Sequence, residues 1–305
     1  MSAAAPAFEP LRVESAAARH RKKLVWVVAL TGTYLVAEVI GAFVTGSLAL
    51  LADAGFMFTD LVAVSLALFA IKIAARPASA RRTYGYYRAE VLAALANALL
   101  MVFICGFILF EAYQRVQHPR EVMGGGMMAV ALVGLAVNIA GALLLRQAAR
   151  ESLNMRGAYL EVLGDMVGSL AVIAGGVIIW FTGWRLVDPV LSVGIGLFIL
   201  PRAWSLLRES LDILMESTPR HLDLPRLRAR LTAIAGVAGV HDLHAWTLTS
   251  GMTALSGHLV VPDPAQHFAV LAAARGMLRD EFGLEHVTLQ LEPPDFDESA
   301  HGLHA

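Results

Sequence analysis

Six apolar runs, each long enough to cross a lipid bilayer, constrain this chain more than any other feature of its sequence. A helix needs about 20 apolar residues to span the hydrocarbon layer, and 57% of the 305 residues are hydrophobic, too many for an ordinary soluble domain. The sequence therefore predicts an all-α membrane domain with spans at Leu24–Val44, Leu48–Ile71, Val91–Phe110, Val122–Leu145, Ala158–Phe181 and Leu186–Leu207.

Basic residues flank these spans unevenly, and Lys and Arg concentrate on the cytoplasmic side of membrane proteins. The connections on one side carry only Arg115, Arg120 and Arg185. We therefore expect a multi-pass protein of the plasma (inner) membrane, with both termini in the cytoplasm. The residues that mark the cytoplasmic side are Arg12, Arg19, Arg21, Lys22, Lys23, Lys72, Arg76, Arg81, Arg82, Arg88, Arg146, Arg150 and Arg156.

The composition changes to that of a soluble domain after the last span. Strand-like and helix-like segments follow one another in the order α-β-β-α-β, which predicts a small sheet with helices on one side, an α+β domain. Asp223 and Pro225 indicate the capped start of its first helix. The expected elements are a helix to about Ile234, strands at His241–Thr249 and Thr253–Val261, a helix at Ala265–Glu281 and a strand at His286–Glu292.

The spans and the C-terminal elements divide the chain into four segments, and its charge and cysteine content bear on which functions to expect. A formal net charge of −1 gives no reason to expect nucleic-acid binding, and the single cysteine, Cys105, excludes an intrachain disulfide. The segments are a disordered tail at 1–23, the transmembrane domain at 24–210, the αββαβ domain at 211–294 and a second disordered tail at 295–305.

Acidic residues inside the apolar runs are the strongest functional signal. Charged groups in hydrocarbon are costly and usually line a polar path. Glu161 and Asp165 are four residues apart and share one helix face, and Phe56 and Asp60 repeat this spacing in the second run. We expect Asp60, Glu161 and Asp165 to form one divalent-cation site. Asp53 is a weaker candidate, as a ligand, a relay or a contact to a helix N-terminus, and structural hydrogen bonding between helices is the alternative for all of these carboxylates.

Such a site suits transport better than catalysis. Metal ions and protons compete for the same carboxylate oxygens, so one site that opens alternately to each side of the membrane is sufficient for metal/proton exchange. The sequence has no G-x-x-x-x-G-K-[ST] loop for ATP, so protons are the expected coupling ion. It also lacks H-E-x-x-H and a nucleophile–base pair within the spans, and we expect no enzyme activity.

Four stretches resemble the cation diffusion facilitator family, and its bacterial zinc-efflux branch in particular. They begin at Gly46 (GSLALLADAG), Arg82 (RTYGYYRAE), Leu163 (LGD, then Gly168-Ser169) and Val240 (VHDLHAW). The resemblance implies six spans, a ferredoxin-like cytoplasmic domain through which homodimers form, and export of divalent metal against protons. It implies no cofactor other than the transported metal and a possible regulatory one.

The departures from that family concern the metal ligands. The zinc branch has His-x-x-x-Asp in both spans, whereas this chain has Phe56 and Glu161 at the two histidine positions. Loss of imidazole weakens the preference for Zn²⁺ and favours harder ions. We expect transport of Zn²⁺ first, with Mn²⁺, Fe²⁺ or Co²⁺ as further substrates. The alternative is a transport-inactive membrane sensor or scaffold with a degenerate site.

The resemblance implies a regulatory metal site in the C-terminal domain at His241, His258, Gln290 and Glu292, with His286 as a further candidate ligand. The alternative is that each histidine is an ordinary surface or turn residue. Alternation along the last strand puts His286 on the same face as Gln290 and Glu292, and puts His244 on the opposite face of its strand from His241. Arg88 and Asp212 resemble a charge pair of the family, for which exposure to solvent is the alternative.

Overall fold

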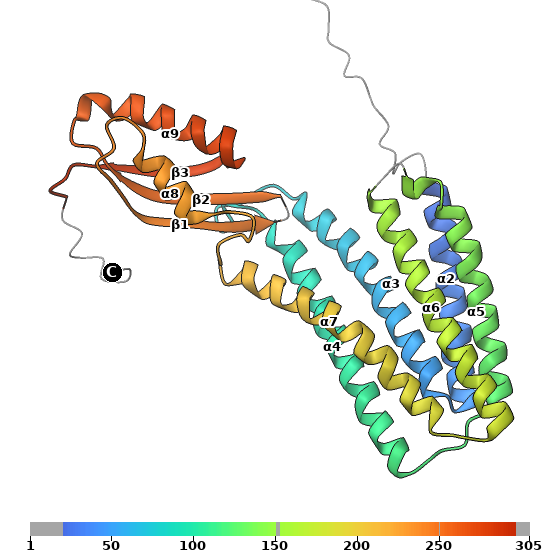
Figure 1. Cartoon of the computed structure of the whole chain (residues 1–305). Helices are drawn as coiled ribbons and strands as arrows, with labels where there is room; N and C mark the ends of the chain where they lie inside the picture. The colour runs from blue at the N-terminus through green and yellow to red at the C-terminus, as the bar shows by residue number, and fades with distance from the viewer. Residues whose placement is uncertain (1–20, 151–152, 250, 297–305) are drawn as a thin grey trace, which may run out of the picture. The chain divides into compact units, whose positions relative to one another are not determined.

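The computed structural model describes residues 21–150, 153–249 and 251–296, so most of the two expected tails lies outside it. Six of its helices are long and apolar enough to cross a membrane, which confirms the predicted fold class. Phe43, Phe103 and Phe181 expose most of their side chains on these helices, as lipid-facing residues do. The helices are α2 (Arg21–Thr45), α3 (Leu48–Ala74), α4 (Arg88–Gln117), α5 (Gly124–Leu145), α6 (Leu153–Thr182) and α7 (Val187–Leu214) (Figure 1).

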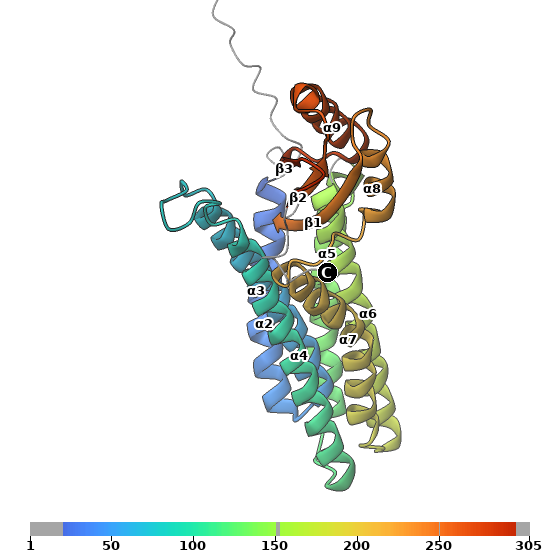
Figure 2. The same cartoon turned by 90° about the vertical axis from the view of Figure 1, so that its left-hand side faces the viewer.

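The described residues divide into two compact units, one with 21–64, 100–150 and 153–203, the other with 65–99, 204–249 and 251–296. In the first unit, α2, α5 and α6 lie side by side in both views (Figure 1, Figure 2). Small residues allow close approach of membrane helices. At Gly176 of α6, an added Cβ would lie only 2.9 Å from the carbonyl oxygen of Gly124 in α5.

Local sequence explains the sharp corner between α2 and α3. Gly46 has a φ of +73°, a conformation that glycine adopts without strain, and it ends α2. Ser47 then caps α3, because its Oγ accepts a hydrogen bond from the backbone N–H of Leu50 at 3.1 Å.

A buried ion pair secures this corner. Asp188, at the start of α7, accepts hydrogen bonds from Ser47 Oγ at 2.7 Å and from the backbone N–H groups of Leu48 at 2.8 Å and Ala49 at 3.1 Å. Arg115 of α4 lies 3.3 Å from the same carboxylate. We call these five residues the Asp188 network. It satisfies N–H groups that a helix start leaves without a partner, and it joins three helices.

A hydrophobic cluster packs next to this corner. It contains Ala42, Ala49, Leu50, Met127, Ala131, Val172, Ile179 and Val187, contributed by α2, α3, α5, α6 and α7. Further along α3 and α6, towards Asp60 and Glu161, a cavity opens whose wall combines acidic side chains with apolar ones such as Phe56. The first unit is therefore tightly packed at the Asp188 network and hollow at the acidic residues.

The C-terminal domain contains one three-stranded sheet, as predicted. Its order is β1 (Gly239–Thr249), β2 (Met252–Val260) and β3 (His286–Glu292), with β1 antiparallel and β3 parallel to β2. Helices α8 (Leu224–Thr232) and α9 (His267–Phe282) pack on one face. Asp223 caps α8, because its carboxylate accepts a hydrogen bond from the N–H of Arg226 at 3.0 Å. The opposite face of the sheet carries the histidines.

A β-bulge changes which histidines share that face. The β1–β2 register shifts between His241 and His244, and Asp242 has a φ of +46°, a left-handed conformation that Asp tolerates better than most residues. The extra residue brings His244 to the same face as His241. The expectation of opposite faces was wrong, because strict alternation does not hold across a bulge.

The pair between Arg88 and Asp212 that the resemblance suggests is not formed, because each residue pairs with another one. Arg88 Nη2 lies 2.5 Å from Glu216 Oε1, while Asp212 Oδ2 lies 3.2 Å from Arg220. Asp212 lies in the last turn of α7, and Glu216 lies two residues after the end of this helix. The spacing of charges in the sequence did not distinguish these two acceptors.

Candidate intramembrane cation site

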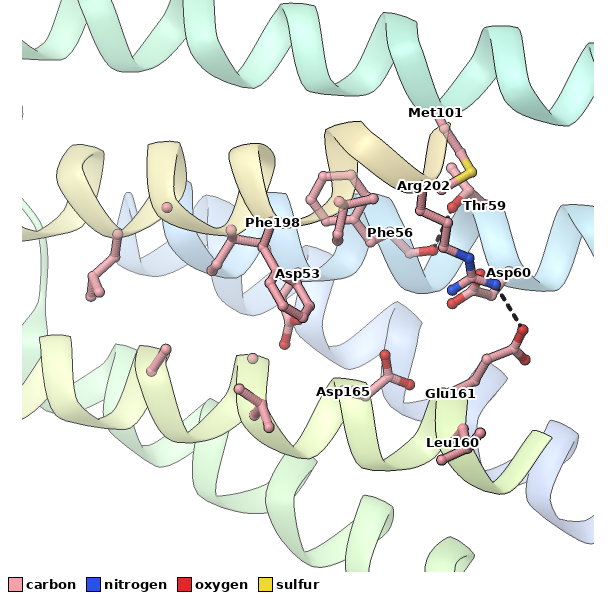
Figure 3. A pocket seen from close by; sticks show the side chains of 18 of the residues that line it. Asp53, Phe56, Thr59, Asp60, Met101, Leu160, Glu161, Asp165, Phe198 and Arg202 are labelled. Carbon is pink, nitrogen blue, oxygen red and sulfur yellow. Dashed lines mark hydrogen bonds and ion pairs between the residues drawn. The ribbon is translucent and has the colours of Figure 1, made fainter. Parts of the chain in front are cut away.

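The three membrane carboxylates line one cavity of about 680 Å³ in the first unit. Asp60 comes from α3, and Glu161 and Asp165 come from adjacent turns of α6, as Figure 3 shows. Their side chains are partly buried. The structure thus brings the predicted residues of the second and fifth spans to a common space.

Phe56 stands one turn from Asp60 on α3 and also borders this cavity. Its side chain is 5% exposed and packs in a cluster with Leu48, Ala52 and Cys105. A phenyl ring offers no ligand atom, so Phe56 provides an apolar wall at the position where the resemblance implies a histidine ligand. Next to it, Thr59 Oγ1 donates to the carbonyl oxygen of Phe56 at 2.7 Å.

Asp53 lies two turns from Asp60 on the same wall of the cavity. It faces α6 at Gly168, where an added Cβ would be 2.5 Å from Asp53 Oδ1. A larger residue at 168 would therefore require the Asp53 carboxylate to move. Asp53 does not serve the N-terminus of α3, because Ser47 and Asp188 occupy the N–H groups of Leu48, Ala49 and Leu50.

A basic residue that the sequence analysis overlooked also enters the cavity. Arg202 of α7 places Nη2 3.0 Å from Glu161 Oε1, and Figure 3 shows its guanidinium group beside Asp60. The available signal was its position within the last apolar run, directly after Pro201. The search for acidic residues in the spans did not consider a basic one.

These carboxylates surround the cavity without converging. Among the described residues, one group places three possible ligand atoms within 4.8 Å of one another. It consists of His241, His258 and Glu292 in the C-terminal domain, and it does not include the membrane carboxylates. The spacing in the membrane cavity suits a hydrated cation, whose water molecules extend the reach of each carboxylate.

The C-terminal group is compact because Glu292 lies between two imidazoles. Glu292 Oε1 is 2.9 Å from His258 Nδ1, and Oε2 is 3.1 Å from His241 Nε2. Ligand atoms around a tetrahedral Zn²⁺ are about 3.3 Å apart, given bonds of about 2.0 to 2.1 Å. The donor set and its spacing therefore fit zinc after a small adjustment.

The remaining C-terminal candidates take other positions. Gln290 Nε2 donates to Glu292 Oε1 at 2.7 Å and so orients that carboxylate. His286 is outside the group, and its ring packs edge-on against Tyr84 with 5.5 Å between centroids. Asp242, which the sequence analysis did not select, lies 2.8 Å from His244 and 3.6 Å from His258.

Comparisons with known proteins agree with this architecture. The cation efflux transmembrane domain matches residues 24–215, and the cytoplasmic domain of cation efflux proteins matches residues 219–294. The chain is similar to the metal cation efflux system protein CzcD of Cupriavidus metallidurans, with 48% identity over 275 residues that cover 90% of this chain and 87% of the relative.

Two further relatives carry names that specify transport. The zinc transporter ZitB of Escherichia coli is 40% identical over 275 residues, 90% of this chain and 88% of its own. A "cadmium, cobalt and zinc/H(+)-K(+) antiporter" of Bacillus velezensis is 39% identical over 274 residues, 88% of this chain and 87% of its own. By its two matched domains and these full-length relatives, the chain belongs to the cation efflux family, whose members are membrane transporters rather than enzymes.

Proposed function

We propose that this protein exports divalent metal ions from the cytoplasm in exchange for protons, with the cavity at Asp60, Glu161 and Asp165 as the transport site. The observation that carries this proposal is three carboxylates around one 680 Å³ space inside a membrane domain. Such groups bind a divalent cation or protons, but not both fully at once. The antiporter name of one relative supports proton coupling.

The packed hydrophobic cluster lies at one end of the spans and the cavity lies beyond it, an arrangement that supports alternating access. With the cytoplasmic side assigned from the basic flanking residues, we infer that the Asp188 network lies at the outer end of the spans. There the hydrophobic cluster around Leu50 and Ile179 separates the site from the outside. The cavity lies on the cytoplasmic side of this barrier, so ions enter from the cytoplasm. Export then requires the helices to close at the cytoplasmic end and to open at the outer end.

The ligand atoms at the transport site influence which divalent metal ion is carried. Zinc, cadmium and cobalt stand in the names of the relatives, and Zn²⁺ accepts carboxylate ligands. Here Phe56 and Glu161 leave a site of oxygen donors without imidazole, and oxygen donors suit Mn²⁺ relatively better than histidine does. We infer that Zn²⁺ is the main substrate and that Mn²⁺, Fe²⁺ and Co²⁺ are carried more readily than through a histidine-bearing site.

Replacing Glu161 by His tests this selectivity. The change adds an imidazole at the cavity and removes a negative charge, so uptake should shift towards Zn²⁺ and away from Mn²⁺ by about tenfold in the ratio of kcat/KM values. Proteoliposomes with a pH gradient and an internal metal-sensitive dye measure both ions, together with Fe²⁺, Co²⁺ and Mg²⁺. The exposed Glu209→His variant on α7 is the control. Equal ratios in the wild type and Glu161→His would show that this carboxylate does not select the metal.

We propose that His241, His258 and Glu292 bind a regulatory Zn²⁺ in the cytoplasmic domain, with Gln290 and Asp242 orienting the ligands. The group lies on the sheet face opposite α8 and α9. The match to the dimer-forming cytoplasmic domain of the family supports a homodimer. Metal at this face would then report cytoplasmic metal levels to the pair of subunits.

Replacing Glu292 by Gln should weaken Zn²⁺ binding at this group at least tenfold, because it removes the charged ligand between the imidazoles. Calorimetric titration of the full chain carrying Asp165→Asn measures the cytoplasmic event apart from the transport site. Glu285→Gln, an exposed position just before β3, should retain wild-type affinity. Unchanged affinity in Glu292→Gln would contradict the assigned ligand set.

A further inference from the structure

Arg202 is a permanent cation at the edge of a site that should bind cations. Its Nη2 is 3.0 Å from Glu161 Oε1, and it lines the same cavity as Asp60 and Asp165. Arginine keeps its charge at every pH that a protein meets. A positive charge here must therefore either compete with the transported ion or balance part of the negative charge.

The number of charges favours the second possibility, in which Arg202 balances part of the negative charge of the site. Four carboxylates line the cavity. Asp53 packs against Gly168, two turns from Asp60, and the three at the transport site, Asp60, Glu161 and Asp165, carry three negative charges when ionised. One divalent ion neutralises two of these three charges. The guanidinium neutralises the third, and its contact identifies Glu161 as the carboxylate that it neutralises. Without Arg202, a bound divalent ion would leave an excess negative charge in a membrane cavity, where uncompensated charge is costly.

We propose that Arg202 is a specificity-determining residue of the transport site: by pairing with Glu161 it adjusts the site to the charge of one divalent ion. This inference rests on the proposed transport function. Asp60 and Asp165 then supply the two negative charges that attract the ion, and the charge of Glu161 is balanced by Arg202. The pair also limits affinity, so that the ion can leave.

The exposure of the pair fits a contact that adjusts to the ion. The side chains of Arg202 and Glu161 are 60% and 38% exposed, and such pairs are worth little energy. A weak pair can lengthen when a metal ion approaches and re-form when the ion leaves. This behaviour contrasts with the buried pair of Arg115 and Asp188, whose members are 9% and 0% exposed.

Zinc uptake by proteoliposomes, measured as initial rate against zinc concentration, tests the role of Arg202. Arg202→Gln should lower KM about fivefold, the size of an exposed charge interaction, and should also lower kcat because release slows. Arg202→Lys retains the charge and should keep KM within about twofold of the wild type. The double variant Glu161→Gln with Arg202→Gln leaves two net negative charges, as in the wild type. It should restore KM to within about twofold of the wild-type value.

The control variant is Arg208→Gln, at an exposed position further along α7 that does not line the cavity. It should leave KM and kcat unchanged. A lower kcat in Arg202→Gln with unchanged KM would mean a structural role and overturn the inference, as would failure of the double variant to restore KM. If Asp165→Asn abolishes uptake in the same assay, that failure concerns Arg202 alone. Undiminished uptake by Asp165→Asn overturns the proposed function as well.

Discussion

Replacing Asp165 by Asn should reduce proton-driven zinc uptake about 100-fold or more, the largest functional effect that we expect from a single substitution. Asn retains the size of the side chain but removes one of the two carboxylates whose charge attracts the ion. Asp165 lines the cavity from α6, one turn from Glu161 on the same helix (Figure 3). Asp53 of α3 also lines this cavity. The remaining carboxylates, with Arg202 still present, no longer balance a divalent charge.

The measurement is initial zinc uptake by proteoliposomes with equal amounts of folded protein, checked by size-exclusion chromatography. Asp212→Asn is the matched control, because Asp212 forms an exposed surface pair with Arg220 and should be dispensable. Cells that depend on this protein for metal tolerance should lose it with Asp165→Asn. Full tolerance in that strain would instead favour the alternative of a membrane sensor that does not transport.

The sequence was sufficient to predict the membrane architecture because the bilayer imposes a length and a composition on each span. The predicted run at Leu48–Ile71 became α3, and the run at Ala158–Phe181 lies within α6. The rarity of acids in hydrocarbon selected Asp60 and Asp165, and helical spacing placed Glu161 beside Asp165. These rules act locally along the chain, so they need no knowledge of how the helices pack.

Features that depend on packing between segments were not predictable in this way. Arg202 takes its role from α7 lying next to the acidic face of α6. The position of His244 depends on the bulge at Asp242, and an extra residue in a strand leaves no clear pattern in a single sequence. The role of Asp188 depends on partners that are 140 residues away at Leu48 and 73 residues away at Arg115.

Replacing Asp188 by Ala should destabilise the protein by about 3 to 5 kcal/mol, the cost of removing one partner of a buried ion pair. Arg115 would keep the carboxylate of Glu111 at 3.2 Å but would lose the one at 3.3 Å, while Ser47 Oγ and the N–H groups of Leu48 and Ala49 would lose their acceptor in a dry environment. Buried donors without acceptors are costly individually. Their loss at one corner should loosen α3, α4 and α7 together.

Thermal unfolding of the purified protein in detergent, followed by tryptophan fluorescence, measures this effect. Glu121→Gln is the control, because Glu121 also forms an ion pair, with Arg185 at 3.1 Å, but at an exposed position with 85% of its side chain accessible. Its loss should change stability by less than about 0.5 kcal/mol. Asp188→Asn, which keeps one acceptor oxygen, should fall between the two. An Asp188→Ala protein as stable as Glu121→Gln would show that the Asp188 network does not hold the outer corner together, and the closed barrier proposed there would need another physical cause.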